Sequence, residues 1–321
     1  MRTILVSLCF VLTNVVPGAA ADDNGPRLLE NQTYRRPTQT NSNNPASIRV
    51  DVNMALVPVT VLDGLGHNVL GLNRENFRVF DDTEQRPIVT FGQSDAPVSV
   101  GLIFDCSRSM REKYKIAREA PAELYSLLNP NDESFLITVA DKPQLRQNFT
   151  SAFNDIQNAL LFTNPDGTTS LLDGVYMGLQ ELKKAHNPRK ALIVVSDGGD
   201  NNSRYTLREL TSLAAEADVE IFSICLYDKP QTVEEVDGPA LLSKLTQASG
   251  GINYMIGDVK EMKTAFGRVG VTLHNQYVLG YYPPDNAPCG KYRKITVKVL
   301  VPAGLPKLKI YARNGYFVPE K

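Results

Sequence analysis

Continuous apolar runs of strand length recur through the middle of the chain and alternate with segments of helical periodicity. The apolar runs lie at Val98–Phe104, Phe135–Ala140, Ala191–Val195 and Ile221–Leu226. Strands that are apolar throughout are typical of a sheet covered on both faces. Their alternation with helices predicts βαβ units, and therefore a doubly wound, mainly parallel sheet of the α/β class over residues 96–274.

Six helices are expected in this domain, over residues 112–128, 151–160, 169–186, 206–217, 238–249 and 258–274. The third shows the period most clearly, because its apolar residues fall on one face: Leu172, Val175, Leu179 and Leu182. Pro121 lies inside the first predicted helix, so we expect that helix to be kinked or to begin later.

Both flanks of the α/β segment carry short strands with a two-residue rhythm. Before it come "IRVDVNMALVPVTVLD", "FRVFDD" and "PIVTFGQ", and after it come "QYVLGYYP", "RKITVKVL", "KLKIYAR" and "GYFVP". Neither flank has enough strands to close a core alone. We expect residues 47–95 and 275–321 to pair in one small β-sandwich, with the α/β domain inserted in it. Two independent β pieces are the alternative.

The first 46 residues predict export. Arg2, the apolar run Ile4–Val16 and the small residues before Asp22 match a signal peptide over residues 1–21, and polar residues 22–46 predict a flexible leader. A buried N-terminal helix is the alternative to a signal. No run is long enough for a membrane span in the mature chain. We therefore expect a secreted or periplasmic protein.

Charge and cysteine content exclude several classes of protein. The formal net charge is −1 and no basic stripe is present, which argues against binding to nucleic acid. Cys9 would leave with the signal, and the remaining Cys106, Cys225 and Cys289 are odd in number and scattered, unlike a disulfide framework. We expect Cys106 and Cys225 to be buried thiols that pack as small apolar groups.

Polar side chains follow the predicted strands at the points where those strands end. Asp105, Ser107 and Ser109 follow the first strand in "DCSRSM", Asp197 follows the third in "SDGGD", and Thr169 begins a helix in "NPDGTTSLLDG". Ligands of open α/β sheets bind at these carboxyl ends. A set of hydroxyls and carboxylates without sulfur or imidazole suits Mg²⁺, or Mn²⁺ or Ca²⁺. The sequence therefore predicts a metal site that leaves positions for water or for a carboxylate from outside.

Other interpretations of these polar residues stay open. Thr168 competes with Thr169, and Ser109 and Thr169 are also suited to cap helix N-termini. Asp200 and Asp173 are second-shell candidates that would hold metal-bound waters, although helix capping or solvation would also explain them.

"DCSRSM", the "GTT" at 167–169 and "SDGGD" together resemble the von Willebrand factor A (VWFA) domain and its metal-ion-dependent adhesion site (MIDAS). "ENFRVFDD" before the domain and "YVLGYYP", "KYRKITVKV" and "NGYF" after it are similar to bacterial secreted VWFA-related proteins, over about residues 48–319. The resemblance implies one antiparallel edge strand around "QLRQNF". It also favours Thr169 over Thr168 and implies metal binding, direct or through water, by Asp105, Ser107, Ser109, Thr169 and Asp197.

This resemblance implies a non-enzymatic adhesion or assembly module that binds, through the metal, an acidic side chain of a protein partner. One alternative is a structural envelope protein with a vestigial metal site. Another is a metal-dependent hydrolase, but position 107 is Ser where such an enzyme would carry a second carboxylate. No Gly-x-Ser-x-Gly elbow or Gly-x-x-x-x-Gly-Lys phosphate loop is present either.

Overall fold

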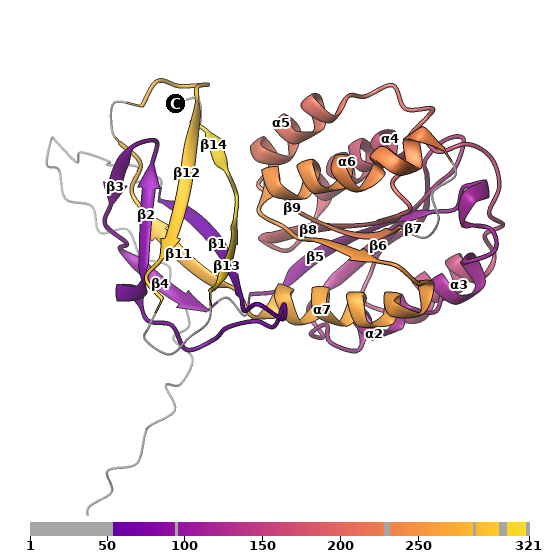
Figure 1. Cartoon of the computed structure of the whole chain (residues 1–321), viewed down its shortest axis with the longest axis horizontal. Coiled ribbons are helices and arrows are strands. Elements are labelled where there is room, and N and C mark those ends of the chain that lie inside the picture. The colour runs from indigo at the N-terminus through magenta and orange to yellow at the C-terminus, as the bar shows by residue number, and fades with distance from the viewer. Residues whose placement is uncertain (1–53, 94–95, 228–231, 285–286, 302–306, 319–321) are drawn as a thin grey trace, which may run out of the picture. The chain divides into compact units, whose positions relative to one another are not determined.

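The computed structural model describes residues 54–93, 96–227, 232–284, 287–301 and 307–318 (Figure 1). The expected signal peptide and leader lie outside the described residues. No helix among the described residues combines the length and the apolar composition that crossing a bilayer requires.

A six-stranded sheet forms the centre of the α/β domain. Its strand order is β10-β9-β8-β5-β6-β7, and every neighbouring pair is parallel except β6–β7. This arrangement confirms the predicted fold class and the antiparallel edge strand. The strand β10 was not predicted. The bounds are β5 (Val98–Asp105), β6 (Glu133–Val139), β7 (Gln144–Thr150), β8 (Arg189–Ser196), β9 (Glu220–Leu226) and β10 (Asn253–Ile256).

Helices cover both faces of this sheet, as the apolar strands require. Figure 1 shows α4, α5 and α6 on one face, and α2, α3 and α7 on the other. The α-helices are α1 (Tyr114–Ala117), α2 (Pro121–Tyr125), α3 (Phe153–Leu161), α4 (Leu171–Glu181), α5 (Leu207–Ala217), α6 (Val233–Ser249) and α7 (Met262–His274). Short 3₁₀ helices are η1 (Arg74–Asn76), η2 (Arg108–Met110), η3 (Leu182–Lys184) and η4 (Val259–Glu261).

The predicted helix over 112–128 is wrong as a single element. It is divided into α1 and α2, and Pro121 stands at the start of α2, where its missing N–H costs no hydrogen bond. The helix predicted over 238–249 begins earlier, at Val233, and contains Pro239 in its interior.

Residues of β5 point alternately into the two layers of the core. Leu102 and Phe104 pack into one apolar cluster and Ile103 into the other, and all three are fully buried. Cys106 and Cys225 are buried free thiols, as expected, and burial raises the pKa of each to about 12. Thiols with so high a pKa are poor nucleophiles at neutral pH.

The flanking segments form two four-stranded antiparallel sheets around a second core. One has the order β13-β1-β11-β4 and the other the order β14-β12-β2-β3. In both sheets a strand from before the α/β segment pairs with one from after it, in β1–β11 and in β2–β12. The bounds are β1 (Ala55–Leu62), β2 (Phe77–Asp81), β3 (Glu84–Arg86), β4 (Thr90–Gln93), β11 (Tyr277–Tyr281), β12 (Tyr292–Val299), β13 (Lys309–Ala312) and β14 (Gly315–Phe317).

A buried carboxylate connects four of these strands. Asp81 is fully buried, and its Oδ2 accepts hydrogen bonds from the hydroxyls of Tyr281 (3.1 Å) and Tyr316 (2.9 Å). The Nε of Arg293 donates to Asp81 Oδ1 at 2.5 Å. Tyr281 belongs to β11, whereas the other three residues belong to β2, β12 and β14 of the opposite sheet. The network therefore joins the two sheets through the core.

We expect Asp81→Ala to lower the free energy of unfolding by about 3 kcal/mol or more, because it leaves Arg293 without its buried partner. Urea unfolding followed by the tyrosine signal in near-UV circular dichroism measures this effect. Glu84→Gln is the control, because it removes an exposed ion pair to Arg86 worth less than about 1 kcal/mol. Equal midpoints for the two variants would contradict a structural role for Asp81.

Candidate metal centre

Several loops surround one cavity of about 340 Å³ at the carboxyl ends of the parallel strands, and three of these loops carry the predicted residues. Ser107 and Ser109 line it from the loop after β5, Thr169 from the loop before α4, and Asp197 from the loop after β8. Asp105, the fifth predicted residue, is fully buried and is in hydrogen-bond contact with Ser107. The fold therefore brings all five predicted residues together from positions up to 92 residues apart in the sequence.

The first loop is shaped by Asp105 at the end of β5. The amide of Ser107 donates to Asp105 Oδ1 at 2.8 Å, which folds the chain into a tight turn. The Oγ atoms of Ser107 and Ser109 then lie 3.1 Å apart. The hydroxyl of Ser196 donates to Asp105 Oδ2 at 2.6 Å, because β8 lies beside β5 in the sheet. Both oxygens of Asp105 are thereby oriented by hydrogen bonds.

The second loop distinguishes Thr168 from Thr169. Gly167 has a φ of +89°, and a Cβ there would lie 2.6 Å from the carboxylate of Asp141. This close approach lets the amide and hydroxyl of Thr168 donate to Asp141 Oδ1 at 2.7 and 2.8 Å. The amide of Thr169 donates to Asn201 Oδ1 at 3.0 Å. Both threonines line the cavity, but the hydroxyl of Thr168 already donates a hydrogen bond to Asp141.

Main-chain hydrogen bonds join the first two loops. The amide of Asp166 donates to the carbonyl of Cys106 at 2.9 Å, and the amide of Arg108 donates to the carbonyl of Gly167 at 3.1 Å. These bonds fix the separation of the two loops, so their hydroxyls are held in place before any ligand binds.

Helix capping does not explain Ser109 or Thr169. The N-cap residue of η2 is Ser107, and the N-cap residue of α4 is Ser170. The capping interpretation of Ser109 and Thr169 is therefore wrong. Both residues line the cavity, and neither is the N-cap residue of a helix.

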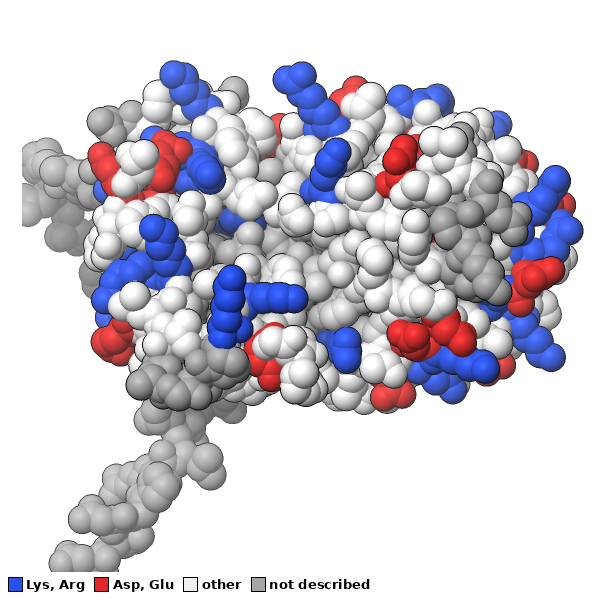
Figure 2. Space-filling view, in the orientation of Figure 1, with Lys and Arg blue, Asp and Glu red and all other residues white. Residues whose placement is uncertain are grey.

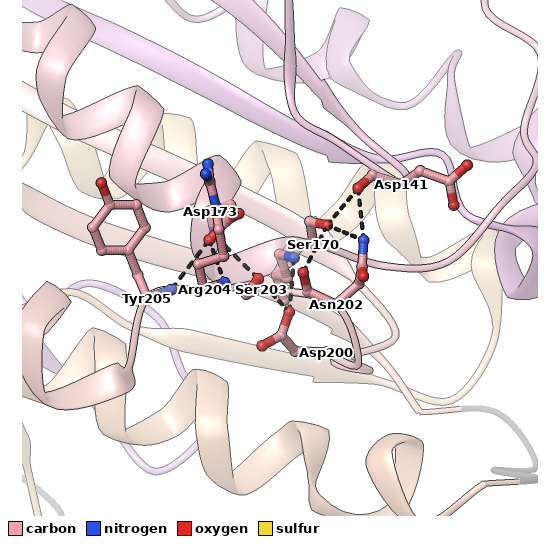
Figure 3. Close-up of polar contacts among 9 residues, drawn as sticks. Asp141, Ser170, Asp173, Asp200, Asn202, Ser203, Arg204 and Tyr205 are labelled. Carbon is pink, nitrogen blue, oxygen red and sulfur yellow. Dashed lines mark hydrogen bonds and ion pairs between the residues drawn. The ribbon is translucent and has the colours of Figure 1, made fainter.

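Asp200 and Asp173 hold the third loop against the start of α4 (Figure 3). Asp200 Oδ1 accepts hydrogen bonds from the amide of Leu171 (3.0 Å) and the hydroxyl of Ser203 (2.6 Å). Asp173 Oδ1 accepts from the amides of Arg204 (2.8 Å) and of the following residue, Tyr205 (3.2 Å). Neither carboxylate is part of the cavity wall. Their second-shell role toward a metal remains a prediction.

Several supporting residues were missed by the sequence analysis. Ser196 orients Asp105 and Asn201 orients Thr169. Figure 3 shows Asn202 between Asp141 and Ser170, where its Nδ2 donates to the Asp141 carbonyl (2.8 Å) and to Ser170 Oγ (3.0 Å). The signal available was the polar run "SDGGDNNS" directly after a buried strand.

Comparison with known proteins identifies a domain family. The family model described as the von Willebrand factor type A domain matches residues 100–199. These residues form a VWFA domain. A search among curated protein sequences gives no match.

Several solved structures are similar to this chain at low sequence identity. Proximal thread matrix protein 1 from the mussel byssus has a TM-score of 0.50 and 15% identity, and the match covers 60% of this chain and 51% of that one. A von Willebrand factor type A protein from Catenulispora acidiphila has a TM-score of 0.49 and 13% identity, with coverage of 82% and 74%. BatB from Bacteroides thetaiotaomicron has a TM-score of 0.45 and 16% identity, with coverage of 55% and 98%. At these identities the likeness concerns the fold alone.

Two buried carboxylates, Asp105 and Asp197, interact electrostatically at the carboxyl ends of the strands of the VWFA domain. Burial and, after it, the nearby charge of Asp197 raise the pKa of Asp105 to about 7, against the opposing effect of the hydrogen bonds from Ser107 and Ser196. A positive charge in the cavity would relieve both the desolvation and the repulsion.

The donors present fit a hard divalent cation. No three His, Cys, Asp or Glu side chains cluster as metal ligands within the described ranges, so a cation here would rely on hydroxyls as well as on the two carboxylates. Hydroxyl and carboxylate oxygens are ligands that Mg²⁺ and Ca²⁺ accept, with waters completing the shell.

The raised pKa of Asp105 gives the metal-free protein a particular pH dependence. Between about pH 4 and pH 7 Asp105 binds more protons in the folded state than in the unfolded state, so its contribution to stability falls as the pH rises through this window. We expect Asp197→Asn to reduce that fall, because it removes the charge that repels Asp105.

Urea midpoints at pH 4.5 and pH 7.5 in EDTA test this expectation. Glu119→Gln, an exposed carboxylate of the same domain, is the control and should match the wild type. A fall of equal size in Asp197→Asn and in the wild type would show that the two carboxylates do not interact.

Proposed function

We propose that this protein is a divalent-metal-dependent binding module of the adhesion or assembly type, which holds a carboxylate of a protein partner at a MIDAS metal. The observation that carries the proposal is the convergence of three hydroxyls and the Asp197 carboxylate on one cavity of a VWFA domain, with the carboxylate of Asp105, which Asp197 repels, buried next to Ser107. The export signal expected from the sequence adds a secreted or periplasmic location to the proposal.

Each of the five residues has a distinct part in this proposal. Ser107, Ser109 and Thr169 would offer hydroxyl oxygens from the cavity wall, and Asp197 a carboxylate. Asp105 would stabilise the site indirectly, through its hydrogen bond with Ser107, because both of its oxygens already accept hydrogen bonds. A bound Mg²⁺, or Mn²⁺ or Ca²⁺ in its place, would supply an electrophilic position for an additional carboxylate.

The composition of the wall supports binding rather than turnover. Among the described residues that line the cavity, none is His, Cys or Lys, three side chains that commonly activate a nucleophile or act as one. The Ser107 hydroxyl lies against Ser109 rather than against a base. The complete set of five residues also disfavours a vestigial site, in which loss of donors would be expected.

Metal binding is tested by calorimetric titration with Mn²⁺ and Mg²⁺. We expect Thr169→Val to weaken Mn²⁺ binding by about tenfold or more, because it removes a hydroxyl from the cavity. Thr168→Val is the matched control, since its hydroxyl serves Asp141, and it should change the affinity less than about threefold. Equal losses in the two variants would contradict the assignment of Thr169, and no heat from wild-type protein would contradict the metal site.

Partner binding is tested separately, by capture from the envelope of the producing cell. Immobilised wild-type protein in Mg²⁺ should retain proteins that EDTA releases and that Asp105→Ala does not retain, because that variant lacks the buried carboxylate of the site. Mass spectrometry of the eluates identifies the retained proteins. Retention of the same proteins in Mg²⁺ and in EDTA would contradict a metal-dependent partner.

A further inference from the structure

Arg108 is the one positively charged residue among the described residues that line the cavity. It lies between Ser107 and Ser109 in the sequence, so its Cα is about 3.8 Å from the Cα of each. Its side chain is 73% exposed. A guanidinium group presents its N–H donors in a planar fork that matches a carboxylate. The mouth of the candidate metal centre thus carries a second group suited to an acidic ligand.

Asp166 holds Arg108 only loosely. The Nε of Arg108 lies 3.2 Å from Asp166 Oδ1, and Nη2 of Arg111 lies 2.8 Å from the same oxygen. The amide of Gly167 also donates to that oxygen, at 2.8 Å. Exposed pairs of this kind contribute little to stability. Arg108 can therefore turn toward an incoming carboxylate, while Arg111 continues to neutralise Asp166.

A broad positive field does not explain attraction to this end of the molecule. Figure 2 shows Lys and Arg side chains interspersed with Asp and Glu over the visible face. Asp141 also lines the cavity, and its hydrogen bond from the Thr168 amide lowers its pKa, so it stays charged at neutral pH. Selection of an acidic ligand must therefore come from the direction and reach of Arg108 itself.

We propose, on the basis of the function proposed above, that the partner segment carries two acidic side chains, one for the metal centre and one for Arg108. Alternate residues of an extended chain point the same way and lie roughly 7 Å apart. An extended acid-x-acid segment therefore presents two carboxylates side by side. Arg108 is the residue that selects such a segment over one with a single acid.

Exposed apolar residues beside the site favour a polypeptide over a small dicarboxylate. Phe162 is 87% exposed and Leu161 43% exposed at the end of α3. Phe162 is three residues before Pro165, whose carbonyl accepts a hydrogen bond from Arg111 Nε at 3.3 Å. Three residues of chain span at most about 11 Å, so this apolar surface lies near the point where Arg111 contacts the loop. A polypeptide bound at Arg108 would extend over it, whereas a small acid would leave it exposed.

Two short peptides test the proposal on Mn²⁺-loaded protein. One is acetyl-Gly-Asp-Gly-Asp-Gly-amide, and the other has Asn in place of the second Asp. Broadening of the peptide NMR signals by bound Mn²⁺ gives the two dissociation constants. Two carboxylates give a twofold statistical advantage at the metal alone, so we expect about a tenfold preference for the first peptide, from the added contact with Arg108. Arg108→Gln should reduce that preference to about twofold.

Controls separate this inference from the proposed function. Arg204→Gln alters an arginine that is 85% exposed and paired with Asp173 at 3.3 Å but does not line the cavity, and it should keep the preference. The affinity of Arg108→Gln for Mn²⁺, measured by calorimetry, should equal that of the wild type, which shows that the metal centre is intact.

Several results would overturn the inference. They are a twofold preference in the wild type, a tenfold preference that survives in Arg108→Gln, or Mn²⁺-loaded protein that binds neither peptide. Glutarate that binds as tightly as the doubly acidic peptide would overturn the assignment of a polypeptide ligand. Wild-type protein that binds no Mn²⁺ would instead contradict the proposed function, so the two failures are distinguishable.

Discussion

Two buried carboxylates, Asp105 and Asp197, at the ends of β5 and β8, repel each other. Burial and the charge of Asp197 together raise the pKa of Asp105 to about 7. Without a cation this arrangement costs folding stability, since the charged form of Asp105 is disfavoured. A fold that retains such a cost is consistent with a site that is completed by a positive ion, and the neighbouring hydroxyls of Ser107, Ser109 and Thr169 are the donors such an ion would need.

The rest of the VWFA domain keeps that arrangement in place. Parallel pairing of β5 with β8 brings Ser196 to Asp105, and main-chain bonds from Arg108 and Asp166 tie the first two loops together. Because these contacts are made by the main chain and by a short side chain, the loops that carry the donors keep their positions without a ligand. Function would thus depend on local geometry at the strand ends, whereas Arg108 and Phe162, both exposed, would decide which partner is accepted.

Much of this could be predicted from the sequence, and the limits have physical causes. Buried strands such as Val98–Phe104 and the polar residues that follow them have strong local signals, because strand ends in parallel sheets meet at one edge. Supporting contacts have no local sequence signal. Ser196 is 91 residues from Asp105 in the sequence and contacts it only because their strands pair. Pro121 in the sequence predicts a kink or a late start in the first helix, and the helix is divided there. The strand β10 has only four residues and follows a glycine pair, so its pattern is too short to detect.

The central claim is that a divalent cation binds among the Ser107, Ser109 and Thr169 hydroxyls in front of Asp105. Anomalous diffraction from crystals grown with Mn²⁺ tests it most directly, because the scattering peak identifies the ion and its position. The account predicts one strong peak within about 2–2.5 Å of oxygen atoms of Ser107 and Ser109. Mn²⁺ peaks found only elsewhere, with water alone in this cavity, would contradict it.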